Sequence, residues 1–322
     1  MRVCIIGHFG DNHDEGVRIV GHELACELQL NGIDVKKINM SSLLQMVKIF
    51  TFDPAIIHFV LSPTVLGLII AKMISQINPR KKIVISAIHP AINERKINQW
   101  LAPDLILVQS KNSEVLFSNL GFKTKIFPNG ISIKKFFPYE LSEKQQIREK
   151  YKIPSNKFVI LHLASITKER NLEILCNIQK GNDCQVIIIG RVHESMDLEV
   201  YTQLKKAGCA VWIEHFPNIE EIYNLADCYV FPTVEKKACI ELPLSVLEAM
   251  ACNIPVITTR FGALPNNFAE GDGLFYYENF DELSSYVKKI MANEVSVRTR
   301  EKVIHFSWEN LIEELKKIYE TL

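Results

Sequence analysis

The sequence predicts an α/β protein built from two doubly wound domains. Short runs rich in Ile and Val alternate along the whole chain with longer segments of helical periodicity, which is typical of α/β folds. Several of these runs are apolar throughout, as strands are when helices cover both faces of a parallel sheet. The 322 residues are enough for two domains. In such folds, ligands bind at the carboxyl ends of the strands.

The expected elements fall into two similar halves. The first half has expected strands at 2–6, 34–38, 55–61, 82–87 and 104–109, and expected helices at 17–31, 64–77 and 111–120. The second half has expected strands at 158–164, 185–190, 209–213, 228–231 and 254–259, and expected helices at 219–226, 244–252 and 281–292. Residues 132–150 are polar and interrupted by Pro and Gly, which indicates a linker followed by a short helix. We therefore predict domains at 1–138 and 139–305, followed by an amphipathic closing helix at 306–322.

Composition and charge exclude several classes of protein. The chain has 37 basic and 37 acidic side chains and 48% hydrophobic residues, which excludes a disordered chain, a collagen and a disulfide scaffold. Residues 1–150 hold 19 Lys and Arg against 13 Asp and Glu. This excess is too small to indicate nucleic-acid binding, but it permits a peripheral contact with an anionic membrane surface. The eight cysteines form no CxxC pair, which fits free thiols in the cytoplasm.

One apolar helix carries the most informative polar residue. The helix is expected to begin near Pro243, where proline is favourable, and Glu248 is its only charged residue. A carboxylate among apolar residues needs a partner, and a sugar or ribose diol would serve. Capping of backbone amides or an ion pair with Arg260 would serve as well. The free amides of Leu244 and Ser245 at the helix start would suit an anion.

This stretch resembles the donor-binding segment of the retaining glycosyltransferases of family 4, the group 1 glycosyltransferases with the GT-B fold. The residues that carry the resemblance are LPLSVLEAMACNIPVITTRFGALP. In the family, two glutamates stand eight positions apart, and the resemblance implies that Glu248, the second, holds the donor ribose. The first falls at Ile240, and Glu241 is displaced by one position. Either Glu241 takes over the contact to the donor sugar or that contact is lost.

A second resemblance concerns the donor diphosphate. FVILHLASITKERNL, residues 158–172, aligns with a family strand that is followed by an Arg and, five positions later, a Lys, which together grip the diphosphate. Here Ser165 replaces the Arg, Arg170 replaces the Lys, and Lys168 is an additional cation. Arginine binds phosphate through two parallel hydrogen bonds, so Arg170 preserves the chemistry. Without the resemblance, Lys168 and Arg170 are ordinary solvated residues at a helix start.

The first half resembles the family more loosely. Gly16 begins a helix and matches one glycine of the family's Gly-Gly loop, whose amides face the donor phosphates. His89 follows a strand, as does the family histidine that contacts the reacting sugar, although a histidine at a strand end is more often structural. His58 resembles another family histidine and is expected to be structural. The linker PNGISIKKFFP, residues 128–138, also matches, and the resemblance implies that the closing helix crosses back to the first domain.

We therefore predict a GT-B glycosyltransferase whose two Rossmann-like domains face each other across a cleft. It would move a sugar from a nucleoside-diphosphate-sugar donor to a glycan or lipid-linked acceptor hydroxyl, with retention of configuration and with no metal or resident cofactor. A degenerate, non-catalytic partner subunit and a nucleotide-sugar epimerase are the alternatives. Two weaker patterns are a divalent-cation site in DNHDE, residues 11–15, and a membrane-surface segment at 41–50, for which packing on the sheet is the favoured interpretation.

Overall fold

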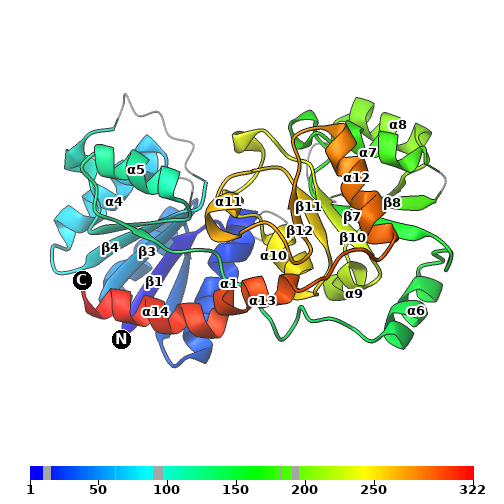
Figure 1. Ribbon diagram of the computed structural model, residues 1–322. Coiled ribbons are helices and arrows are strands. Elements are labelled where there is room, and N and C mark those ends of the chain that lie inside the picture. The colour runs from blue at the N-terminus through cyan, green and yellow to red at the C-terminus, as the bar shows by residue number, and fades with distance from the viewer. Residues whose placement is uncertain (10–15, 62, 90–96, 182, 191–195) are drawn as a thin grey trace. The chain divides into compact units, whose positions relative to one another are not determined.

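The chain separates into two compact units (Figure 1). The computed structural model describes residues 1–9, 16–61, 63–89, 97–181, 183–190 and 196–322, so the acidic loop 11–15 lies outside the described residues. The first unit comprises Met1–Gly130, Cys239–Leu242 and Phe306–Leu322. The second unit comprises Ile131–Ala238 and Pro243–His305. The first boundary thus follows Gly130 rather than residue 138, and the short segment Cys239–Leu242 belongs to the first unit although its neighbours in sequence belong to the second.

The first unit is built on a parallel sheet of six strands in the order β2-β1-β3-β4-β5-β6. The strands are β1 (Arg2–Gly7), β2 (Asp34–Asn39), β3 (Ile56–Leu61), β4 (Lys82–Ala87), β5 (Leu105–Val108) and β6 (Thr124–Ile126). The order reverses between β1 and β3, because β2 lies on one side of β1 and all later strands lie on the other. This is the arrangement of a doubly wound fold.

Helices cover both faces of this sheet (Figure 1). They are α1 (Gly16–Leu30), α2 (Leu43–Met46), α3 (Lys48–Phe52), α4 (Val65–Ile77), η2 (Gln99–Leu101), α5 (Lys111–Asn119) and α14 (Trp308–Glu320). On one face, α3, α4 and α5 bury Ile49, Leu68 and Phe117 in a common core with the strands. α1 contacts α14 on the other face. Strands buried on both sides explain the continuous apolar runs in the sequence.

The closing helix α14 docks through an aromatic contact that requires a glycine. A β-carbon at Gly130 would lie 2.3 Å from Cδ2 of Trp308, so the Trp308 ring lies directly on the backbone there. The Trp308 indole N–H donates to Glu23 Oε2 of α1 at 3.1 Å. Further along α14, the Tyr319 hydroxyl and His58 Nδ1 are 2.6 Å apart, and His58 Nε2 is 2.8 Å from Ser86 Oγ. The His58 side chain is fully buried, and burial lowers its pKa to about 3, in accordance with a structural role.

The second unit repeats the architecture with strands in the order β12-β11-β10-β7-β8-β9. The strands are β7 (Phe158–Leu163), β8 (Cys184–Ile189), β9 (Ala210–Trp212), β10 (Cys228–Phe231), β11 (Val256–Thr258) and β12 (Leu274–Tyr276). The helices are α6 (Leu141–Lys150), η3 (Lys168–Arg170), α7 (Glu173–Gln179), α8 (Leu198–Lys206), α9 (Ile219–Asn224), η4 (Lys236–Ala238), α10 (Leu244–Ala251), α11 (Leu264–Asn267), α12 (Phe280–Met291), α13 (Thr299–Val303) and η5 (Ile304–Phe306). α7, α8 and α12 share one core with the sheet, and α9, α10 and α13 cover the other face (Figure 1). In the described part of the chain, every helix is too short or too polar to cross a membrane.

Candidate functional site

The strand order of the second unit reverses between β7 and β10. Ligands of open parallel sheets bind outside the carboxyl ends of the strands at such a reversal. The carboxyl end of β7 leads to Ser165 and then to Arg170, and the carboxyl end of β10 leads to Thr233 and then to α10. The two segments predicted to hold the donor therefore both begin at the reversal point.

Arg170 is a buried cation at this point. It ends the short helix η3, and Asn171 follows in the left-handed conformation with φ 55°. Asn171 Nδ2 donates to the carbonyl of Pro232 at 3.2 Å, which ties the turn to the end of β10. Arg170 is only 5% exposed, and in the described part of the chain its guanidinium has neither a carboxylate partner nor a hydrogen-bond acceptor. Because burial of an unpaired charge is costly, this environment fits a guanidinium that binds an anionic ligand.

Two further buried polar groups, on His162 and Thr233, accompany Arg170. His162 Nδ1 lies 2.8 Å from the carbonyl oxygen of Val230, which can only accept, so Nδ1 carries the proton and Nε2 is an acceptor. Burial, with the charge of Arg170 as a further cause, lowers the pKa of His162 to about 3, so the ring is neutral. His162 Nε2 and Thr233 Oγ1 are both buried without a hydrogen-bond partner among the described residues. Neither residue was predicted, although a histidine inside the apolar run FVILHL was a visible signal.

The start of α10 supplies backbone donors. Pro243 is the N-cap and provides no side-chain hydrogen bond, while the amides of Val246 and Leu247 donate to the Pro243 carbonyl at 3.2 and 3.4 Å. The amides of Leu244 and Ser245 have no acceptor among the described residues. Unpaired amides at a helix start carry partial positive charge and favour anions.

Glu248 lies one turn further along α10 and has a protein partner. The hydroxyl of Tyr223, a fully buried residue of α9, donates to Glu248 Oε2. Burial, together with the nearby Glu248 charge, raises the pKa of Tyr223 well above its ordinary value, so the hydroxyl stays protonated and remains a donor. Arg260, one of the partners considered for Glu248, forms an ion pair with Glu270 at 3.7 Å. The Tyr223 contact was not predicted, since 25 residues separate the two in sequence.

Ser165 and Lys168 differ in their surroundings. Ser165 is buried directly after β7, at the reversal point. Lys168 is exposed, and its ammonium pairs with Glu199 Oε2 at 2.6 Å. That ion pair raises the pKa of Lys168, so its charge persists, but solvent screens it. Of the two predicted cations, only Arg170 has the burial expected of a direct ligand-binding group.

In the first unit, Glu241 is held by helix α5. Its carboxylate accepts hydrogen bonds from the hydroxyl of Ser110, the N-cap of α5, and from Ser113 Oγ, which is 2.9 Å from both carboxylate oxygens. The backbone of the next residue, Leu242, is bound by two buried side chains: its N–H donates to Gln109 Oε1 at 2.9 Å, and its carbonyl accepts from Asn129 Nδ2 at 2.8 Å. These four side chains fix Cys239–Leu242 within the first unit.

The same segment brings the other predicted residues of the first unit together. Ile240 is buried, and its Cδ1 would lie 3.2 Å from a β-carbon at Gly16, the first residue of α1. The Glu241 amide donates to the carbonyl of Ile88 at 2.9 Å, and the half-buried His89 comes next in the chain. Gly16 and His89 therefore lie beside Cys239–Leu242, the segment that contains Glu241.

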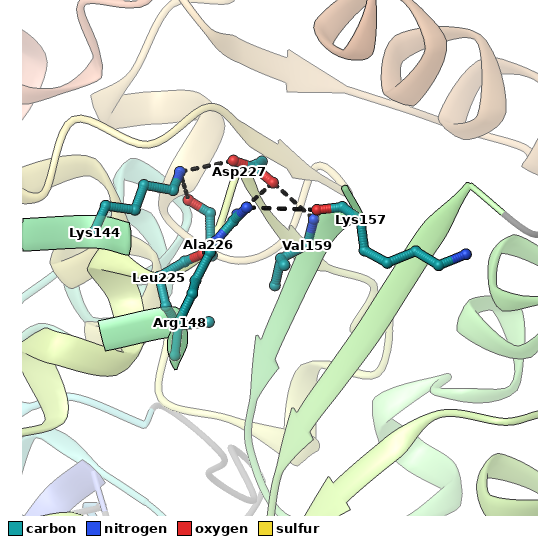
Figure 2. Close-up of polar contacts among 7 residues, drawn as sticks. All are labelled: Lys144, Arg148, Lys157, Val159, Leu225, Ala226 and Asp227. Atoms are coloured by element: carbon teal, nitrogen blue, oxygen red, sulfur yellow. Dashed lines mark hydrogen bonds and ion pairs between the residues drawn. The ribbon is translucent and has the colours of Figure 1, made fainter. Parts of the chain in front are cut away.

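At the amino-terminal ends of β7 and β10, by contrast, partly buried charges are compensated (Figure 2). Asp227 Oδ1 pairs with Lys144 Nζ at 2.7 Å, and Asp227 Oδ2 pairs with Arg148 Nη2 at 2.6 Å and accepts from the Val159 amide at 2.8 Å. Burial raises the pKa of Asp227, but the two cations and the amide outweigh it and keep that pKa below its ordinary value. A cavity of about 590 Å³ adjoins this network. Since its charges are paired, we interpret the network as the structural attachment of α6 to the sheet.

Comparison with known proteins identifies the family. A family model described as glycosyl transferases group 1 matches residues 143–307, just over half of the chain. The chain belongs to the group 1 glycosyl transferases. The matched region of this group 1 glycosyl transferase contains Arg170, Thr233, Glu248 and the start of α10. The prediction of a group 1 glycosyl transferase is thereby confirmed.

Individual relatives agree with this assignment. The chain is 27% identical over 249 residues to the capsular polysaccharide biosynthesis glycosyltransferase CapM of Staphylococcus aureus, which covers 70% of this chain and 63% of that protein. The structure of HepE from Anabaena in complex with UDP is similar with a TM-score of 0.79 at 14% identity, over 100% of both chains. Sucrose-phosphate synthase from Thermosynechococcus elongatus matches with a TM-score of 0.79 at 15% identity, over 100% of this chain and 98% of that one. These likenesses confirm the predicted GT-B fold class.

Proposed function

We propose that this group 1 glycosyl transferase moves a sugar from a nucleoside-diphosphate-sugar donor to an acceptor hydroxyl, and that its second unit binds the donor. The observation that carries the proposal is the buried Arg170, which has no counter-ion among the described residues and lies where the strand order reverses. Membership of the family supports the transfer chemistry. The complexes of HepE with UDP and UDP-glucose make a uridine nucleotide the first donor to test.

Arg170 and the helix amides would stabilise the leaving group. Breaking the bond between sugar and nucleotide leaves negative charge on the diphosphate, and fixed cations and dipoles aimed at that charge lower the barrier. The guanidinium can bind two phosphate oxygens at once, and the amides of Leu244 and Ser245 can donate to others. The buried hydroxyl of Ser165 is a further donor at the end of β7. Metal independence of the transfer is part of the proposal and rests on the resemblance to the family.

Glu248 would bind the ribose diol, with Tyr223 as its positioning residue. Because the Tyr223 hydroxyl donates to Oε2, it orients the carboxylate. Glu241, whose carboxylate is already bound by Ser110 and Ser113, favours the alternative in which the family's contact to the donor sugar is lost.

The remaining parts of the proposal rest on the resemblance. Retention of configuration and a contact between His89 and the reacting sugar are properties of the family pattern. A glycan or lipid-linked acceptor is consistent with CapM, whose name assigns it to capsular polysaccharide biosynthesis. Replacement of His89 by alanine should lower turnover and leave nucleotide affinity nearly unchanged.

The second candidate is a non-catalytic subunit that binds nucleotide. Position 240 favours it, because the family has a glutamate there and this chain has Ile240, which packs beside Gly16. Calorimetric titration with UDP, GDP and ADP tests donor binding. Incubation with the matching sugar nucleotide, with and without glycan acceptors, then separates the candidates. Transfer to an acceptor supports the proposal, binding without turnover supports the subunit, and conversion of one sugar nucleotide into another without an acceptor would indicate an epimerase. Failure of all three nucleotides to bind would refute the donor site.

A further inference from the structure

Helix α4 of the first unit exposes an apolar line of side chains. Leu66, Ile69, Met73 and Ile77 are between 36% and 65% exposed, although Leu68, Ala71 and Ile74 of the same helix already bury its other face in the core. Positions three and four apart lie on one side of a helix, and the line from residue 66 to residue 77 is about 16 Å long. Lys72 is the only charged residue in α4. A soluble helix normally presents polar residues on its outer face, so the exposed side requires an explanation.

The exposed surface continues onto neighbouring elements. Trp100 of η2, which contacts α4, is 58% exposed, and Lys72 Nζ lies 5.5 Å from the centroid of its ring. Phe50 of α3 and Val47, the N-cap of α3, are exposed, while Ile49 packs in the same core layer as α4. Figure 1 shows α4 and α5 on the face of the sheet opposite α1 and α14. We name Leu66, Ile69, Met73, Ile77 and Trp100 the α4 ridge.

The charges around the α4 ridge are mostly positive. From Leu43 to Lys81 the chain contains Lys48, Lys72, Arg80 and Lys81, against Asp53 alone. Asp53 pairs with both Lys81 and Arg2, so its charge is compensated. Lys48, Lys72 and Arg80 have no ion-pair partner among the described residues. The surface therefore combines an apolar ridge with cations that pair with no carboxylate of the described residues, which is complementary to an anionic partner with an apolar interior.

We propose that the α4 ridge is a docking surface for an anionic lipid membrane. The aliphatic side chains would enter the boundary between headgroups and acyl chains, and Trp100 would lie at headgroup level, where indole rings are enriched. The stems of Lys72 and Lys48 would cover apolar surface while their ammonium groups reach anionic headgroups. A second copy of the chain would fit the cations less well, because the face would meet its own positive charge. The inference concerns the first unit and does not depend on the donor site.

Vesicle co-sedimentation tests this proposal with the full chain. Wild-type protein should bind phosphatidylcholine vesicles that contain about 30% phosphatidylglycerol, and should bind pure phosphatidylcholine at least about tenfold more weakly. The variant Leu66→Gln/Met73→Gln should lose about tenfold or more in vesicle affinity, since both side chains are exposed and their replacement leaves the core intact. Lys72→Gln/Arg80→Gln should lose the preference for phosphatidylglycerol. Fluorescence of Trp100 should shift to shorter wavelength when vesicles bind.

Leu30→Gln/Leu141→Gln is the matched control, because these leucines are 79% and 78% exposed and lie outside the α4 ridge. It should bind vesicles like the wild type, and calorimetric titration with UDP should be the same for all variants. Equal vesicle binding by the Leu66→Gln/Met73→Gln variant would overturn the proposal, as would absence of wild-type binding to phosphatidylglycerol vesicles. A concentration-dependent dimer that only the Leu66→Gln/Met73→Gln variant abolishes would identify a second copy of the chain as the partner and would also overturn the proposal.

Discussion

Replacement of Arg170 by methionine should make the free protein more stable while it weakens nucleotide binding. Arg170 is 5% exposed and has no counter-ion among the described residues, so the folded protein bears the cost of removing its charge from water. That cost amounts to several kcal/mol for a buried ion, and methionine keeps most of the packing of the aliphatic stem. We expect a gain of about 1–3 kcal/mol in the free energy of unfolding of the second unit.

The effect on binding has the opposite sign. A hydrogen bond to a charged group contributes about 1.5–3 kcal/mol, so the dissociation constant for a nucleoside diphosphate should rise about 10- to 150-fold. Differential scanning calorimetry of the free protein measures the first effect, and isothermal titration measures the second. The two measurements together distinguish a ligand-binding cation from a structural one.

Arg148→Met is the matched control in the same unit. Arg148 is also largely buried, but it pairs with Asp227 at 2.6 Å and donates to the carbonyl of Leu225 at 2.9 Å (Figure 2). Its replacement removes these contacts and should destabilise the protein by about 2 kcal/mol. The loss is no larger because Lys144 still compensates Asp227. Nucleotide affinity should be unchanged. If Arg170→Met destabilises the free protein as much as Arg148→Met does, the reasoning about an uncompensated cation is refuted.

Three further predictions concern other groups. Glu248→Ala should weaken nucleotide binding more than Glu241→Ala, which should instead lower the thermal stability of the first unit; equal losses of affinity by titration would contradict the assignments. His58 and His162 have pKa values lowered by burial to about 3 from 6.5, so each adds stability that is complete above pH 6.5 and is lost as the pH falls toward 3. Between pH 3 and 6.5, the slope of the free energy of unfolding in urea against pH should therefore be about 1.4 kcal/mol per pH unit smaller in His58→Gln than in the wild type; an unchanged slope would exclude a neutral buried His58. Gly130→Ala should cost at least about 3 kcal/mol by the same assay, because its β-carbon would overlap Trp308, whereas Gly181→Ala, with its nearest neighbour at 3.4 Å, should change little.

The sequence predicted every strand of the two sheets except β6 and β12, each of which forms one edge of its sheet. β1, β3 and β4 lie within one residue of their predicted bounds because apolar runs that helices cover on both faces have a strong pattern. β6 and β12 were not predicted. Each has only three residues, and a segment that short carries little signal, although the edge strands β2 and β9 were predicted.

For the candidate site, the sequence identified polar residues that need a partner, but it did not identify the partners. Glu248 was recognised because a carboxylate in an apolar helix is conspicuous, yet Tyr223 could be found only once α9 and α10 were packed together. The displacement of Glu241 by one position left two alternatives open. Its hydrogen bonds to Ser110 and Ser113, which precede it by 131 and 128 residues, depend on the fold of the first unit and leave no local pattern.

The second unit thus treats the charges at the two ends of its sheet in two different ways, with partly buried charges at one end and the buried Arg170 at the other. At the amino-terminal ends of the strands, Asp227 is matched by Lys144, Arg148 and a backbone amide, which is what stability alone requires. At the carboxyl ends, Arg170 is accompanied by unpartnered groups on His162 and Thr233 and by free amides at the start of α10. Leaving several such groups unsatisfied costs stability that no contact within the described residues returns. A bound anion would satisfy the cation and the amides together, so the unfavourable features of this end of the sheet are the ones that a donor diphosphate would use.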